Sequence, residues 1–233
     1  MTSNDAPRQL PLDLARDAAR SRNDLVVSAS NAAAVAMIDR WPDWPAPVVL
    51  LAGPAGSGKS HLAAIWAEMT GAVLVDPSAV GEAAIAAAGR GPVLIDDADA
   101  GALDENGLFH LLNALRESGF GLLVTARRFP AAWGVALPDL MSRLKAAATV
   151  EIGEPDDALL AGVIVKLFAD RQVEVEPHVV QFVVRRIERS LATAISVVER
   201  LDTAALERKS RITRPLAAEI VGAMDAGQAE LGL

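Results

Sequence analysis

The sequence contains no cysteine, which excludes disulfide bonds and thiolate metal sites. Its three histidines do not follow the spacing of a metal site. No apolar run is long enough to cross a bilayer, which takes about 20 residues. Residues 1–17 are polar and mixed in charge, so we expect no signal peptide. These absences predict a cytoplasmic protein with no membrane partner.

Basic residues are also fewer than acidic ones. The chain has 22 Lys and Arg against 30 Asp and Glu, a net charge of −8. Because affinity for nucleic acids comes mainly from Lys and Arg on phosphates, we expect little direct DNA binding. Hydrophobic residues make up 52% of the 233 residues, which indicates a folded chain of one domain or one domain plus a small appendage.

Apolar runs alternate with helical segments in the first two thirds of the chain. The strand-like runs are residues 48–52, 72–75, 92–95, 121–125 and 150–152. Helical patterns cover residues 31–40, with Ser30 as the expected cap, 59–70 and 107–117. The alternation predicts an α/β fold, a three-layer αβα domain with a parallel sheet.

The pattern changes at Pro155. No strand is predicted after it, and four amphipathic helices are expected over residues 156–171, 177–189, 193–208 and 214–224. The sequence therefore predicts a tail over residues 1–20, an α/β domain over residues 21–153 and a small all-α domain over residues 154–233.

The strongest motif joins the first predicted strand to the next helix. It fits G-x-x-x-x-G-K-S and consists of Gly53, Pro54, Ala55, Gly56, Ser57, Gly58, Lys59 and Ser60. The glycines turn backbone N–H groups towards phosphate oxygens, and the helix N-terminus adds partial positive charge. Lys59 is expected to reach the β- and γ-phosphates, and the Ser60 hydroxyl to bind Mg²⁺. This P-loop predicts a nucleotide site.

Acids follow the third predicted strand, as in a Walker B motif. Asp96 is expected to hold Mg²⁺ through water, and Asp97 to orient the attacking water. Asp99 is interpreted as a solvated loop acid. Thr125 ends the fourth strand, where it either lies near the γ-phosphate or caps a turn.

These parts together resemble the AAA+ ATPases, and more narrowly the DnaA/Hda family. Residues 23–31 resemble the stretch that enters the adenine pocket, which implies Leu25, Val26 and Asn31 as nucleotide contacts. The P-loop exit, residues 58–62, adds His61. The resemblance continues through residues 124–130 at the sensor I strand, residues 140–144 at the arginine finger, and the helical lid. It covers residues 23–224 and implies ADP or ATP with Mg²⁺, and Arg143 as a finger acting in trans.

The N-terminal segment separates the two branches of this family. The chain has no room for the extra N-terminal domain and the basic DNA-binding domain of DnaA. Its segment QLPLDL resembles the peptides that dock on the β subunit sliding clamp of DNA polymerase, with Gln9, Leu10, Leu12 and Leu14 as contacts. Taken alone, the same segment reads as a disordered tail. Because the segment stands next to a single DnaA-type AAA+ module, it favours the Hda branch of the family.

Two positions depart from the family pattern. Ala192 stands where the family places its sensor II arginine, and Arg189 lies three residues earlier on the same predicted helical face. Arg189 is thus either a substitute contact for the nucleotide or a solvated surface arginine. Arg127 stands where an acid usually follows the sensor I strand. Both departures argue for weak intrinsic hydrolysis and are compatible with ADP as a structural ligand.

The resemblance implies a regulator of replication initiation. Such a protein binds ADP or ATP, docks on the sliding clamp and stimulates hydrolysis of ATP bound to DnaA, with DnaA and the clamp as partners and homo-oligomers as a further option. The alternative is a conventional AAA+ ATPase that serves as a clamp-loader or helicase-loader subunit. A DNA-binding initiator variant is disfavoured by the acidic charge.

Overall fold

The computed structural model of the protein describes residue 22 and residues 25–230. Within them the chain forms α1 (Ala32–Asp39), β1 (Val48–Ala52), α2 (Lys59–Thr70), β2 (Val73–Leu74), α3 (Glu82–Ala88), β3 (Val93–Ile95), α4 (Glu105–Ser118), β4 (Leu122–Ala126), the 3₁₀ turn η2 (Pro130–Ala132), α5 (Pro138–Lys145), β5 (Ala148–Glu151), α6 (Asp157–Asp170), α7 (Pro177–Val184), α8 (Leu191–Arg208) and α9 (Arg214–Glu230). Strands and helices alternate as far as β5, and the described chain is helical afterwards.

The five strands form one sheet in the order β2-β3-β4-β1-β5. Every pairing is parallel, with Leu50 of β1 opposite Val124 of β4 on one side and Thr149 of β5 on the other. β1 is therefore an inner strand, and the P-loop that follows it emerges beside the ends of β4 and β5. The predicted parallel sheet is confirmed.

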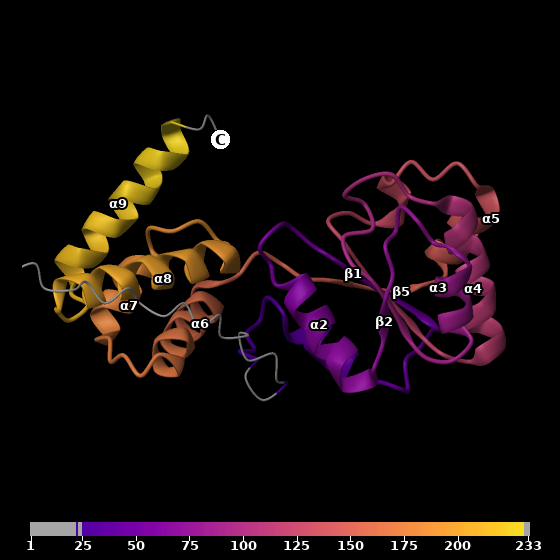
Figure 1. Ribbon diagram of the computed structural model, residues 1–233, viewed down its shortest axis with the longest axis horizontal. Coiled ribbons are helices and arrows are strands. Elements are labelled where there is room, and N and C mark those ends of the chain that lie inside the picture. The colour runs from indigo at the N-terminus through magenta and orange to yellow at the C-terminus, as the bar shows by residue number, and fades with distance from the viewer. Residues whose placement is uncertain (1–21, 23–24, 231–233) are drawn as a thin grey trace, which may run out of the picture.

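Two apolar layers cover the sheet because neighbouring residues of a strand face opposite sides. Leu50 packs with Leu111 of α4 and Leu140 of α5, whereas Leu51 packs with Ile38 of α1 and Trp66 of α2. Figure 1 shows α3, α4 and α5 on one side of the sheet and α2 on the other. The predicted three-layer α/β fold is confirmed.

Helices α6 to α9 enclose a core of their own. It contains Leu160 and Ile164 of α6, Val180 of α7, Val197 of α8 and Ala217 of α9, and the buried residues of this cluster all lie between 160 and 221. Figure 1 shows these helices as a separate unit beside the sheet, reached by the segment that follows β5.

Helix ends differ from the sequence expectations at three places. Asn31, not Ser30, precedes α1, and its side chain makes no capping bond to that helix. Asp104 caps α4 by accepting from the Gly107 N–H, so this helix begins two residues before the predicted start. α7 ends at Val184, whereas a helix to residue 189 was predicted.

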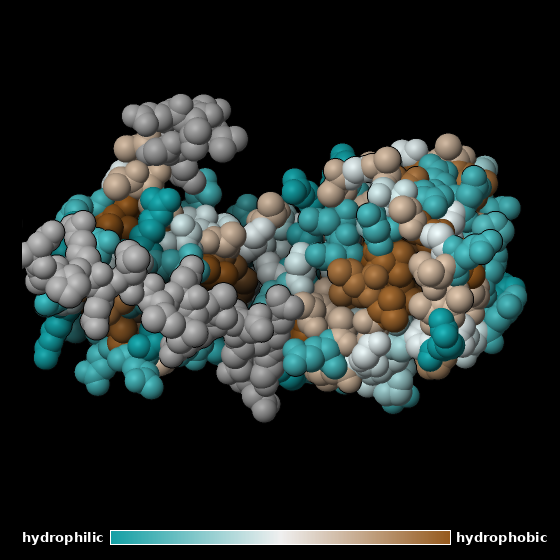
Figure 2. Space-filling view, in the orientation of Figure 1, coloured by the Kyte–Doolittle hydropathy of each residue, from teal (hydrophilic) through white to brown (hydrophobic). Residues whose placement is uncertain are grey.

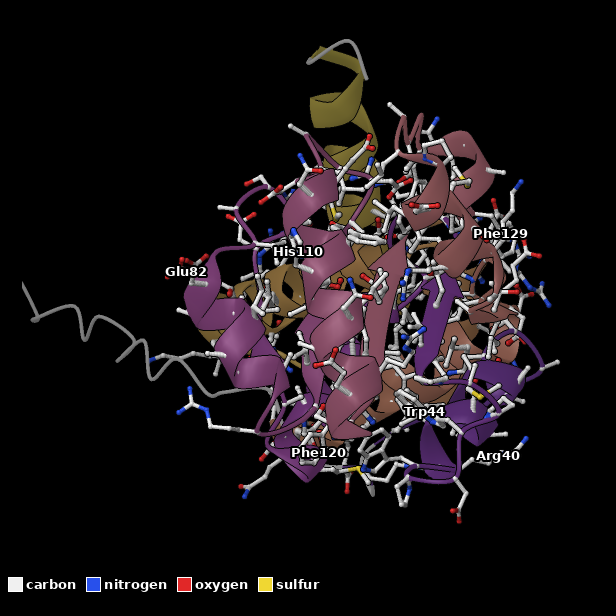
Figure 3. The ribbon with its side chains drawn as sticks, turned by 90° about the vertical axis from the view of Figure 1, so that its right-hand side faces the viewer. Arg40, Trp44, Glu82, His110, Phe120 and Phe129 are labelled. Atoms are coloured by element: carbon white, nitrogen blue, oxygen red, sulfur yellow. The ribbon has the colours of Figure 1, made fainter. Side chains whose placement is uncertain are left out.

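The loops at the carboxyl ends of the strands gather at one edge of the sheet. Figure 3 shows Glu82, His110 and Phe129 towards this edge, and Trp44 and Phe120 towards the opposite one. In open α/β sheets ligands bind outside the carboxyl ends of the strands. The P-loop and the acids after β3 both lie at these carboxyl ends.

One of the two edge strands, β2, has only two residues and both are exposed, Val73 by 44% and Leu74 by 66%. Figure 2 shows an apolar patch over this strand. Such a short edge offers few unpaired backbone groups to another chain. No helix in the described residues has the length and apolar character required to cross a membrane.

Candidate functional site

A pocket of about 400 Å³ lies between the P-loop and the helices α6 and α8. Its volume is in the range that holds a small-molecule ligand or cofactor. The P-loop contributes the run from Ala55 to His61, and the segment before α1 contributes Leu25, Val26 and Asn31. Residues that lie more than 100 positions apart in the sequence thus meet at one cavity.

The P-loop keeps its shape because two of its glycines have left-handed backbone angles. The φ of Gly56 is +72° and that of Gly58 is +96°, values that cost residues with a Cβ about 1–2 kcal/mol. Space is also short, because a Cβ on Gly58 would lie 2.9 Å from Cδ1 of Leu191, and one on Gly56 would overlap the Ser190 hydroxyl. Both glycines therefore allow the start of α8 to approach the loop.

Lys59 is the first residue of α2 and is only 5% exposed. Its ammonium group donates to the carbonyl oxygens of Gly53 and Pro54, each at 2.8 Å. Burial lowers the pKa of Lys59, Asp97 opposes this shift, and the positive charge of Arg127 adds to it. The loop thus holds a cation at its centre, close to the first-turn N–H groups of α2 that have no intrahelical acceptor.

Leu25, Val26 and Asn31 line the pocket from the segment before α1. The Asn31 amide donates to the Val26 carbonyl at 2.9 Å and accepts from the Ser28 N–H at 2.8 Å, and the residue is 8% exposed. Asn31 therefore fixes the segment that carries Val26. Gly162 of α6 makes room for this segment, since a Cβ there would lie 2.7 Å from Cγ1 of Val26.

Asp156 connects the same segment to the start of α6. Its carboxylate accepts from the Leu159 N–H at 2.7 Å, which caps the helix, and from the Ser30 N–H at 3.3 Å. The bond from Leu159 lowers the pKa of Asp156, and the contacts with Ser28 and Ser30 add to this shift. Because α6 carries Leu159, Val163 and Leu167 along one face of the pocket, this cap positions the apolar wall.

The acids after β3 form a network with Thr125. The Thr125 hydroxyl is fully buried, donates to Asp96 Oδ1 and accepts from the Asp97 N–H at 2.8 Å. Asp97 has a φ of +53°, which is uncommon outside glycine and is tolerated best by Asp and Asn. Asp97 lines the pocket, whereas Asp96 and Thr125 do not. Thr125 thus orients the two acids.

The interpretation of Asp99 as a solvated acid is wrong. Its side chain is only 2% exposed and accepts from the N–H groups of Arg127 at 2.7 Å and Arg128 at 3.0 Å. Burial is tolerated because these bonds satisfy the carboxylate oxygens. Asp99 therefore fixes the turn that leaves β4. The motif gave no signal for this role, since the two N–H groups are 28 and 29 residues away.

The structure does not bring Arg189 into the pocket. The residue lies in the turn between α7 and α8, so the helical face that it was expected to share with Ala192 does not exist. Its guanidinium instead donates to the Pro155 carbonyl at 3.3 Å and pairs with Asp157 at 2.9 Å. Ala192 does line the pocket, together with Leu191 and Ile195. α8 therefore presents an apolar wall there.

Arg143 lies on α5, away from the pocket. Its guanidinium stacks over the Phe109 ring at 4.8 Å from the ring centre, a cation–π contact. One turn earlier on α4, Glu105 accepts from the Ala136 N–H at 2.9 Å and the Leu137 N–H at 2.7 Å, just before α5 begins. Two residues of α4 thus position the helix that carries Arg143. Sequence reasoning had missed both.

The pocket lining covers part of the predicted set. It includes Leu25, Val26, Asn31, Ala55, Gly56, Ser57, Gly58, Lys59, Ser60, His61 and Asp97, and it leaves out Gly53, Pro54, Asp96, Thr125, Arg143 and Arg189. It also includes residues that were not predicted as contacts, above all Arg127 and the α6 and α8 walls. The sequence signal for the α6 wall was the helical spacing of Leu159, Val163 and Lys166 along one face. The predicted clamp contacts Gln9, Leu10, Leu12 and Leu14 lie outside the described residues.

The donor groups for a metal are few. Ser60 is exposed at the first turn of α2, and Asp96 uses Oδ1 for the bond with Thr125. No cluster of three or more His, Asp or Glu occurs in the part of the chain described here. A hydroxyl and a carboxylate suit Mg²⁺, which keeps several waters and is held partly by substrate phosphates. The donor set therefore fits Mg²⁺ bound together with a nucleotide.

Solved structures with the same fold include proteins of replication initiation. Domain III of the replication initiation protein DnaA from Thermotoga maritima is 18% identical, with a TM-score of 0.72 over 88% of this chain and 96% of that one. A replication initiator DnaA bound to AMPPCP and single-stranded DNA is 17% identical, with a TM-score of 0.66 over 80% of this chain and 66% of that one. These likenesses establish an AAA+ fold with a helical lid.

The lid sequence is similar to that of one branch. Residues 163–221 match the family model described as Hda, lid domain. Together, the lid match and the DnaA-like fold support an Hda-type, DnaA-related AAA+ protein. An uncharacterized protein of Haemophilus influenzae is 28% identical to this chain over 118 residues. That match takes in 50% of this chain and 51% of the relative, so the chain spans about half the length of this curated relative.

Proposed function

We propose that this Hda-type protein regulates replication initiation by stimulating the hydrolysis of ATP bound to a DnaA partner. The observation that carries the proposal is the separation of its two functional parts. The pocket lies between the P-loop and the lid, whereas Arg143 lies on α5 and does not line it. Figure 1 shows α5 on the side of the sheet that faces away from α6 and α8.

The pocket binds an adenine nucleotide, ADP or ATP. Lys59 and the N–H groups of the P-loop hold the phosphates, and the buried ammonium gains from their negative charge. Leu25, Val26 and the α6 wall cover the base. A structurally similar DnaA, described as bound to AMPPCP, supports this assignment. The proposed boundary between the nucleotide-binding domain and the lid lies between residues 153 and 154.

Ser60 and Asp96 hold Mg²⁺ in this proposal, with Asp96 acting through water. Held by these two residues, the ion would supply positive charge that offsets the negative charge of the phosphates. Thr125 holds the Asp96 carboxylate by a hydrogen bond and keeps the Asp97 N–H in place. Asp97 then faces the pocket, where it orients a water molecule.

Arg143 acts on the nucleotide of the partner. A guanidinium fork stabilises the charge that develops on a transferring phosphoryl group better than the ammonium of lysine. Fingers supplied in trans are worth roughly 10³–10⁵ in rate in well-studied nucleotide hydrolases. Phe109 supports the guanidinium by stacking, and Glu105 fixes the start of α5.

Docking on the sliding clamp brings the two proteins together on DNA. In the proposal Leu12 and Leu14 enter an apolar pocket of the clamp, and the Gln9 amide sets the register. The net charge of −8 is consistent with recruitment through a protein rather than through DNA itself.

The decisive experiment measures hydrolysis of DnaA-bound ATP on clamp-loaded DNA, with and without this protein. The parent protein is expected to accelerate hydrolysis. Arg143→Ala is expected to keep nucleotide and clamp binding but to lose most of the acceleration, and Arg143→Lys to do little better.

Lys145→Ala is the matched control, because Lys145 is an exposed cation on the same helix, two residues away. It is expected to stimulate like the parent. If Arg143→Ala stimulates as well as the parent protein, the trans-finger mechanism is wrong, and sequestration of the partner becomes the better explanation.

A conventional AAA+ ATPase, such as a clamp-loader or helicase-loader subunit, is the second candidate. The observation that favours it is the Asp96, Asp97 and Thr125 network, which provides acids for hydrolysis in this chain's own pocket. Rapid turnover of ATP by the isolated protein, lost in Asp97→Ala, would support this candidate over the regulator.

A further inference from the structure

Basic side chains are concentrated at the end of the lid where α7 packs against α9. Residues 208–214, which lead from α8 into α9, contain four Lys or Arg and no acid. Arg185 and Arg186 follow α7 directly. Figure 1 shows α7 and the beginning of α9 on the side of the lid that lies away from the sheet. None of these basic residues lines the nucleotide pocket, so they are available for another role.

Phe182 of α7 positions two of the arginines. The guanidinium carbon of Arg186 lies 3.8 Å from the centre of the Phe182 ring, and that of Arg214 lies 5.1 Å from it. A ring face attracts a cation without using its N–H donors. The two guanidinium groups are thus held close together, and they keep donors for a ligand.

A third arginine, Arg211, lies in the short segment between α8 and α9. Its neighbour Ile212 is 5% exposed and belongs to the lid core, where Leu216 of α9 is also buried. The packing of Ile212 therefore fixes the backbone on either side, with Arg211 exposed before it and Arg214 exposed at the start of α9. We call Arg186, Arg211 and Arg214 the lid arginines.

Acids do not balance the charge of the lid arginines. All three are exposed, and none of them forms an ion pair in the part of the chain that the structure describes. Arg208, in the same stretch of sequence, does pair with Glu219 of α9. Like charges that are held together repel one another, so an anionic ligand at this end of the lid would be stabilising.

The net charge of −8 does not cancel such a cluster. Exposed charges that are farther apart than about 8 Å are largely screened at physiological salt. The acids elsewhere on the chain therefore leave the local field of the lid arginines positive. They do limit how strongly the isolated protein binds nucleic acid, since that affinity depends on how many phosphates meet a cation.

We propose that the lid arginines contact the phosphate backbone of the DNA on which the sliding clamp is loaded. The planar guanidinium fork suits two oxygens of one phosphate, and contacts of this kind position a protein on DNA without reading its sequence. DNA is favoured over an acidic protein surface because a duplex presents one negative charge per about 1.7 Å of its axis.

Docking on the clamp makes this weak contact effective. A tethered site meets its ligand at an effective concentration of about 1 mM, so a contact too weak for the isolated chain adds to the affinity of the docked one. The inference therefore rests on the clamp docking of the proposed function. It gives the lid a role that differs from closing the nucleotide pocket.

Binding of the full chain to the free clamp and to a clamp loaded on closed circular DNA tests the inference, because only the loaded clamp offers phosphates. The parent is expected to bind the loaded clamp about tenfold more tightly. This gain should shrink as salt is raised from about 50 to about 200 mM. Alanine at all three lid arginines is expected to remove the gain, while the affinities for the free clamp and for ADP stay unchanged.

Two further variants separate the DNA contact from folding and from net charge. Arg211→Glu leaves the contacts of Phe182 intact and is expected to lose most of the gain. Alanine at Arg40, Arg90 and Arg116 together is the matched control, because it removes three exposed arginines of the α/β domain and gives the same net charge as the lid variant. The control is expected to keep the gain.

Three results would overturn the inference and leave the regulator proposal standing. They are equal affinity of the parent for both forms of the clamp, an equal loss of the gain in the two triple variants, and weaker binding of the lid variant to the free clamp. The last result would assign the lid arginines to an acidic surface of the clamp itself. If the parent bound neither form, the clamp docking of the proposed function would fail together with the inference.

Discussion

The backbone N–H of Leu191 donates a hydrogen bond of 2.8 Å to the carbonyl oxygen of Gly56. Gly56 is at the centre of the P-loop, and Leu191 is the first residue of α8 in the lid. This bond and the close packing of Ser190 on the same glycine join two parts of the chain that have separate apolar cores. The lid position is therefore coupled to the conformation of the P-loop.

Replacing Gly56 with alanine tests this coupling. The new Cβ has to displace Ser190, and the φ of +72° adds backbone strain, so we expect a loss of about 1–3 kcal/mol in unfolding free energy together with weaker nucleotide binding. Gly71→Ala is the matched control, since its φ of +69° is similar and nothing lies within 4 Å of a Cβ there. Thermal unfolding of both variants separates the steric effect from the strain, and equal losses would rule out a role for the lid contact.

Lys59→Ala is expected to weaken ADP binding at least tenfold, or about 1.4 kcal/mol, because Lys59 is the buried cation inside the P-loop. Calorimetric titration measures this loss. Lys145→Ala, which changes an exposed lysine of α5 outside the pocket, is expected to bind like the parent. Unchanged affinity in Lys59→Ala would remove the P-loop as the nucleotide site.

Phe109→Ala is expected to reduce the stimulation of DnaA-bound ATP hydrolysis. Loss of a cation–π contact worth about 0.5–2 kcal/mol would slow the stimulated rate by roughly two- to thirtyfold. The binding of ADP by the variant itself should not change, because Phe109 does not line the pocket. Phe109→Tyr keeps an aromatic ring under Arg143 and should restore the rate. A purely structural role for Phe109 would instead appear as a lower melting temperature with an unchanged rate.

Alanine at Gln9, Leu12 and Leu14 together is expected to abolish binding to the sliding clamp, because both apolar anchors and the register-setting amide are removed. Surface plasmon resonance with immobilised clamp measures the binding, and the melting temperature should stay at that of the parent. Clamp binding by the triple variant would show that docking uses another surface.

The sequence by itself determined the elements and the P-loop. A continuous apolar run specifies β1, and Gly56, Gly58 and Lys59 follow it at fixed positions. The loop takes its shape from neighbouring residues, because its glycines can adopt the left-handed backbone angles that it requires. The alternation of strands and helices likewise determined the parallel sheet and its two helical layers.

Only the tertiary structure decided which distant groups meet. Asp99 became a buried anchor for Arg127, Arg189 turned to Asp157, and Phe109 came under Arg143. None of these contacts is a neighbour relation along a helix or strand, so periodicity carries no information about them. They follow from how the loops pack once the sheet is formed, because a buried charge has to find donors wherever the fold places them.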